Sequence, residues 1–131
     1  MGIRRKGRII AFQTIFSWDV IEQDVNELLQ FGWLEEGEAE TETNQSAIDF
    51  ARLLAAGTIE NIEKVDEAIN NHLVNWKFSR LSRVDLAILR ISVYSLLYRD
   101  EIPQKVTIDE AVDIAKKYGS DESYKFVNGV L

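Results

Sequence analysis

The chain has 131 residues, contains no cysteine and carries a formal net charge of −7 at pH 7. The lack of cysteine excludes disulfide bonds, thiolate metal sites and cysteine nucleophiles, and it fits a reducing cytoplasm. A hydrophobic content of 46% is enough for a buried core, so we expect one folded domain over residues 1–131. No apolar run approaches the ~18 residues of a membrane span, and we expect no membrane partner.

Positive charge is concentrated at the N-terminus. The basic residues of the first eight are Arg4, Arg5, Lys6 and Arg8, and no acidic residue precedes Asp19. This run carries a charge of +4. Because the whole chain carries −7, the remaining residues carry −11. Because exposed charges are screened beyond ~8 Å at physiological salt, one end can attract phosphate while the remainder stays acidic. The alternative is a solvated helix start, and in both cases we expect surface charges that contribute little to folding.

The first part of the chain shows helical periodicity in four places. Apolar residues recur at helical spacing over residues 3–21, about 23–31, 46–62 and 65–73. Gly57 lies inside the third segment, where glycine costs ~1 kcal/mol against alanine unless close packing needs it. Residues 35–45 are rich in glutamate and small residues, which predicts an exposed loop.

The segment from Leu81 to Tyr98 is the most apolar of the chain, and its apolar residues cover nearly the whole circumference of a helix. Such a helix is buried on most sides, so we expect the others to pack around it. Ser82 and Asp85 have capping-box spacing at its start. Arg90 lies among apolar neighbours, where a buried ion pair is the usual outcome.

The last part of the chain predicts two more helices. After Pro103, Thr107 and Glu110 have capping-box spacing again, and Gly119 suits the end of that helix. A final helix is expected over residues 121–131. No strand-type alternation occurs, so the predicted fold class is all-α, a single domain of six or seven helices.

Candidate metal and catalytic residues are few. His72 is the only histidine, and the chain has no cysteine to join it. A surface or core role is therefore favoured for His72 over catalysis or metal binding. The glutamates of residues 35–45 could bind a metal, but nothing in the sequence orders their carboxylates, and a solvated loop is the favoured interpretation. We therefore expect no metal site and no cofactor.

Several motifs resemble the NusB family of bacterial transcription antitermination factors. The resemblance covers essentially the whole chain and is weakest over residues 35–45. Its motifs are the basic N-terminal run, Phe16-Ser17-Trp18, RVDLAILRISVYSLLY, Pro103-Gln104-Lys105-Val106, IDEAVDIAKKYG and the closing KFVNGVL. The last is quite specific, since an arbitrary helix has no reason to carry Asn-Gly there.

The resemblance implies a fold and a function. The fold is two small helical bundles packed across each other, and no catalysis is implied. NusB-like proteins bind the boxA element of ribosomal RNA leader transcripts together with the ribosomal protein NusE, in the complex that lets RNA polymerase read through terminators. Members occur as monomers or dimers, so a homodimer stays open.

Site residues follow from the positions that match the family. Those that the resemblance implies at the RNA are Arg4, Arg5, Lys6, Arg8, Phe16, Lys125 and Phe126. Arginine donates two parallel hydrogen bonds to phosphate, and an exposed aromatic ring can stack on an unpaired base. Phe16 stands where the family commonly has tyrosine, so it lacks the hydroxyl, and core packing is the alternative for both phenylalanines. Asp85 matches an acid that faces the ribosomal-protein partner, with helix capping as the competing interpretation.

Two other kinds of function stay open. A similar domain occurs at the N-terminus of a ribosomal-RNA cytosine methyltransferase, so the chain could be a detached RNA-targeting module. It lacks the cysteine and the glycine-rich cofactor loop of the catalytic part, which argues against an enzyme. A helical scaffold that binds only protein is the second alternative, and the isolated basic N-terminus counts against it.

Overall fold

The computed structural model describes residues 2–21, 27, 29, 42–74 and 76–131. The described part is helical and contains no strand, which confirms the all-α class. Its elements are α1 (Ile3–Ile21), α4 (Glu42–Glu60), α5 (Ile62–Asn71), a short 3-10 helix η1 (Phe78–Arg80), α6 (Arg83–Tyr98), α7 (Gln104–Tyr118) and α8 (Ser123–Val130). Most of the helix expected over 23–31 and most of the loop expected over 35–45 lie outside the described residues.

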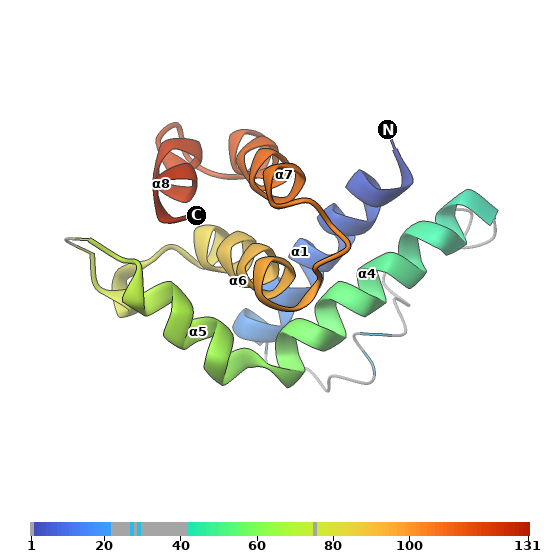
Figure 1. Cartoon of the computed structure of the whole chain (residues 1–131), viewed down its shortest axis with the longest axis horizontal. Coiled ribbons are helices and arrows are strands. Elements are labelled where there is room, and N and C mark those ends of the chain that lie inside the picture. The colour runs from blue at the N-terminus through green and yellow to red at the C-terminus, as the bar shows by residue number, and fades with distance from the viewer. Residues whose placement is uncertain (1, 22–26, 28, 30–41, 75) are drawn as a thin grey trace.

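Helix α6 lies at the centre of the molecule (Figure 1), where α1, α4, α5, α7 and α8 all pack against it. Helix α1 packs most closely on α4, and α7 on α8; α6 lies between these two pairs and also carries α5. This arrangement matches the two small bundles that the family resemblance implies. It also places the start of α1 next to α7, although the two helices are far apart in the sequence.

The burial of α6 confirms the prediction of a central helix. Ten consecutive residues, from Leu86 to Ser95, are buried. The helix begins as expected, because the Asp85 backbone N–H donates to Ser82 Oγ at 3.0 Å. The hydroxyls of Ser92 and Ser95 donate to the carbonyls of Ile88 and Ile91. The helix therefore satisfies its own polar groups inside the core.

Two predicted helix starts are wrong. Helix α4 begins at Glu42, inside the stretch expected to be a loop. Helix α7 begins at Gln104 rather than after Thr107, because the Pro103 carbonyl already accepts the backbone N–H groups of Val106 and Thr107. Proline has its φ preset near the helical value and so starts a helix well. Thr107 is consequently a buried residue within the helix and not its cap.

Gly57 shows why glycine is present inside a helix. A Cβ added at this position would lie 2.1 Å from Tyr94 Oη and 2.2 Å from Tyr94 Cζ. The Tyr94 ring therefore packs directly on the α4 backbone, and α4 and α6 approach each other closely. Four residues later the helix is interrupted at Asn61, whose side-chain amide donates to the Gly57 carbonyl at 2.8 Å. The two helices on either side of Asn61 can thus diverge around α6.

Candidate nucleic-acid and partner interface

The basic run occupies the first turns of α1, but its four side chains have different surroundings. Arg4 and Arg5 are exposed and Lys6 is half-buried, whereas Arg8 is only 6% exposed. The expectation that all four are surface charges is wrong for Arg8, because α6 and α7 cover this part of α1. Burial lowers the pKa of the Arg8 guanidinium from its ordinary value, and the nearby Glu110 carboxylate opposes this effect. Arg8 is therefore a structural residue as well as a charge.

Phe50 of α4 organises this end of α1. The guanidinium carbons of Arg4 and Arg8 lie 5.2 Å and 5.3 Å from the centroid of its ring, at cation–π distance. A Cβ at Gly7 would meet Phe50 Cδ2 at 2.8 Å, so glycine lets the ring reach α1. Sequence reasoning missed this role of Phe50, and the glycine within the basic run was the signal that could have indicated a close neighbour.

Arg5 is bound by two carboxylates of α7. Its Nε donates to Glu110 Oε2 at 2.9 Å, and its Nη2 donates to Glu110 Oε1 at 3.4 Å and to Asp113 Oδ2 at 2.8 Å. Hydrogen bonding to Glu110 and its charge, followed by Asp113, raise the pKa of Arg5 from its ordinary value. An open groove of about 530 Å³ lies beside this contact, between the start of α1 and Pro103 and Val106.

A second groove, of about 620 Å³, runs between α7 and α8. Lys125, a predicted RNA residue, lines it together with Lys116, Tyr124 and Asn128. The Nζ atoms of Lys116 and Lys125 lie 5.2 Å and 5.9 Å from the centroid of the Tyr124 ring. Asp113 lines the same groove and also bonds Arg5, so the two grooves are adjacent. Sequence reasoning proposed neither Lys116 nor Tyr124 as an RNA-binding residue, because only the packing of α8 on α7 brings them together.

The two predicted stacking residues lie elsewhere. Phe126 is half-buried, and its ring packs against that of Trp76 at a centroid distance of 5.3 Å. Trp76 is 57% exposed, so this aromatic pair is open to solvent on one side. Phe16 is half-buried against the core, and it follows Arg5 by eleven residues, roughly 16 Å along α1. The structure therefore brings Arg5 and Lys125 to neighbouring grooves and leaves Phe16 at a distance from the basic run.

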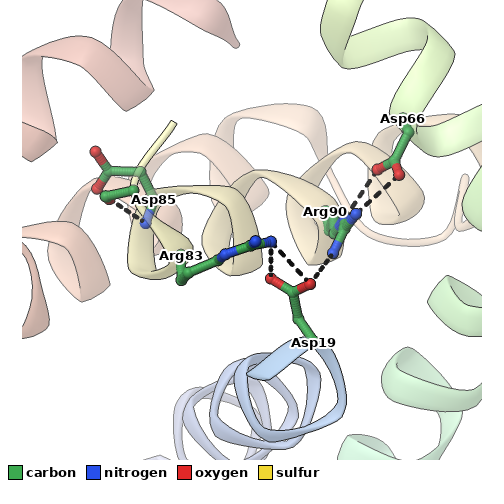
Figure 2. A network of polar contacts seen from close by, with 6 residues as sticks. Asp19, Asp66, Arg83, Asp85 and Arg90 are labelled. Carbon is green, nitrogen blue, oxygen red and sulfur yellow. Dashed lines mark hydrogen bonds and ion pairs between the residues drawn. The ribbon is translucent and has the colours of Figure 1, made fainter. Parts of the chain in front are cut away.

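Asp85 lies in the first turn of α6 with its side chain half-buried. The cap of this helix comes from the Ser82 hydroxyl, which accepts from the Asp85 backbone and not from its carboxylate. Within the described part of the chain, the buried Asp85 Oδ1 has no hydrogen-bond partner. Figure 2 shows this carboxylate turned away from the neighbouring ion pairs of α6. Asp85 is thus a carboxylate with acceptor capacity to spare.

Arg90 of α6 forms the buried ion pair that the sequence predicted (Figure 2). Its Nε and Nη2 donate to the two carboxylate oxygens of Asp66 on α5, both at 2.9 Å. Its Nη1 lies 3.7 Å from Asp19 Oδ1, and Asp19 also accepts two hydrogen bonds from Arg83 at 3.0 Å. The network ties α1 and α5 to α6, which is a structural role.

The described part of the chain holds neither a metal-binding cluster nor a membrane-spanning helix. Among the residues that the structure describes, no group of three or more histidine, aspartate or glutamate side chains could hold a metal ion. None of the described helices is both long and apolar enough to cross a membrane.

The chain is similar to known proteins over nearly its whole length. A curated transcription antitermination protein NusB from Treponema denticola is 46% identical over 98% of this chain and 92% of its own length. The NusB structure of T. maritima has a TM-score of 0.83 and 38% identity, covering 97% of this chain and 86% of that one. A structure of the antitermination factors NusB and NusE in complex with double-stranded RNA has a TM-score of 0.85 and 29% identity. The match covers 99% of this chain and 93% of that one.

The family model described as NusB family matches residues 5–131. This range takes in the cationic start of α1, the central α6 and both helices of the α7–α8 groove. Because this match and the similarity to the relatives both extend over nearly the whole sequence, the chain belongs to the NusB family.

Proposed function

We propose that residues 1–131 act as one RNA-binding helical domain of a cytoplasmic transcription antitermination factor. It binds boxA-type single-stranded RNA in ribosomal RNA leader transcripts, together with the ribosomal protein NusE, in the antitermination complex of RNA polymerase. The observation that carries the proposal is that exposed basic side chains line the grooves on both sides of α7, among the acidic side chains of Glu110, Asp109 and Asp113. Arg4 and Arg5 lie on one side of this helix, and Lys116 and Lys125 lie beside the groove on its other side.

The charge distribution supports a single path for the nucleic acid. Phosphate is attracted to the few cationic surfaces of an otherwise acidic protein, because like charges repel it elsewhere. A strand that follows the start of α1 and the α7–α8 groove would pass the exposed guanidinium of Arg4 and the lysines around Tyr124. Arg8 contributes to the field of this surface while its buried side chain holds α1 in place.

The RNA surface can be tested without touching the buried arginine. Replacing Arg4 and Lys6 with glutamine should weaken binding of a boxA-like single-stranded RNA. It should also flatten the slope of log K against log salt by about 1.4, because each lost phosphate contact removes roughly 0.7. A gel-shift or fluorescence titration at several salt concentrations, with added NusE, measures both quantities. Double-stranded RNA of the same sequence, tested in parallel, measures the preference for single strands.

A matched control removes two positive charges at another place. Lys77 directly precedes η1 and Arg80 ends it, and both are exposed. This segment, yellow in Figure 1, lies away from the start of α1. Lys77→Gln with Arg80→Gln should leave the slope unchanged. Equal slopes for both double variants would refute the N-terminal RNA surface. Absence of RNA binding by the parent protein, with and without NusE, would instead favour a scaffold that binds only protein.

Asp85 is the proposed contact for NusE, because it matches the family's acid that faces the ribosomal-protein partner and its side chain is only half-buried. Asp85→Asn removes the charge but keeps the backbone N–H that Ser82 caps. We expect weaker NusE binding with little change in the thermal unfolding temperature, measured by calorimetric titration and by circular dichroism. Glu63→Gln is the matched control, since Glu63 is an exposed acid in the first turn of α5. Unchanged NusE affinity in Asp85→Asn would leave Asp85 without a partner role.

A further inference from the structure

The contact between Arg5 and α7 has the geometry of phosphate recognition. Arginine binds phosphate through two parallel N–H groups. In this protein the Nε and Nη2 groups of Arg5 both donate hydrogen bonds to Glu110. Asp113 accepts a further hydrogen bond from Nη2. The two carboxylates thus occupy the edge of the guanidinium that a phosphate would use.

We infer that Glu110 and Asp113 are affinity-determining residues of the RNA surface, because they compete with RNA phosphate for the guanidinium of Arg5. The inference rests on the proposed function, and it assigns to two acidic residues a part in binding a polyanion. In the free protein the carboxylates hold Arg5 against α7. An RNA phosphate must displace them. The binding free energy therefore gains only the difference between the Arg5–phosphate and the Arg5–carboxylate interactions.

The exposure of the Arg5 and Asp113 side chains makes this exchange feasible. The Arg5 side chain is 46% exposed and that of Asp113 is 48% exposed, while that of Glu110 is 16% exposed. Solvent-exposed ion pairs contribute little free energy and are weakened by salt, so a phosphate can replace them. The displaced carboxylates then attract cations from solution. This uptake offsets part of the counterion release that the Arg5–phosphate contact would otherwise produce.

The test compares the same carboxylate substitutions in two backgrounds. Glu110→Gln with Asp113→Asn should raise affinity for the boxA-like RNA roughly three- to tenfold when Arg5 is present. The slope of log K against log salt should become steeper by up to about 0.7. In the Arg5→Gln background the same pair of substitutions should change affinity less than about twofold. General attraction from the lost negative charge is equal in both backgrounds, so the comparison isolates the competition.

A matched control removes the same charge from another helix. Glu63 and Glu67 are exposed on α5, and Glu63→Gln with Glu67→Gln should leave RNA affinity within about twofold of the parent. Equal tightening in this control, or equal tightening with and without Arg5, would overturn the inference while leaving the RNA surface intact. Loss of RNA binding in the parent protein itself would instead refute the proposed function.

Discussion

Replacing Arg90 with alanine should lower the free energy of unfolding by about 3–5 kcal/mol, because removing one partner of a buried ion pair leaves the other uncompensated. The Arg90 side chain is 8% exposed, and its fork donates two hydrogen bonds of 2.9 Å to Asp66. Its guanidinium carbon also lies 5.7 Å and 5.9 Å from the ring centroids of Trp18 and Phe78. Alanine would lose these contacts and leave two carboxylates facing a cavity. Chemical denaturation followed by circular dichroism measures the change.

Arg83 supplies the control on the same helix. It also bonds Asp19, at 3.0 Å, but its side chain is 62% exposed. Exposed ion pairs contribute about 0–1 kcal/mol, so Arg83→Ala should have a small effect. Losses of similar size in the two variants would show that burial does not set the strength of this network.

Leu89→Ala should cost about 2–5 kcal/mol of unfolding free energy, the range for a fully buried leucine that leaves a cavity. Leu89 has no exposed surface, and it lies in the middle of the helix that all the other described α-helices contact. The surrounding helices cannot close the gap without moving relative to one another. Urea denaturation of parent and variant measures the loss, provided that the unfolding free energy falls with urea concentration at the same slope in both.

Leu97→Ala is the matched substitution, because Leu97 lies on the same helix with 48% of its surface exposed. It should cost less than about 1 kcal/mol, since little apolar area returns to water. A loss below about 1 kcal/mol for Leu89→Ala would contradict the central role of α6.

Features that depend on neighbours in the sequence were predictable from it. The apolar circumference of residues 82–98 predicted a buried helix, and the spacing of Ser82 and Asp85 predicted its cap. The position of Arg90 among apolar residues predicted a buried ion pair, although not its partner. Helical periodicity predicted the all-α class, the run of basic residues predicted the cationic start of α1, and the motifs predicted the family. These signals are local, because helical periodicity and capping act over three or four residues.

The surroundings of each charged or aromatic side chain depended on the tertiary structure. Arg5 bonds a carboxylate 105 residues away, and Arg90 bonds one 24 residues away. No local pattern distinguishes the buried Arg8 from the exposed Arg4, since the difference arises from where α6 and α7 cover α1. The same applies to Phe50 and Tyr124, whose neighbours come from other helices. Periodicity indicates which face of a helix is apolar, but only the packing of the helices decides which cations remain available to a ligand.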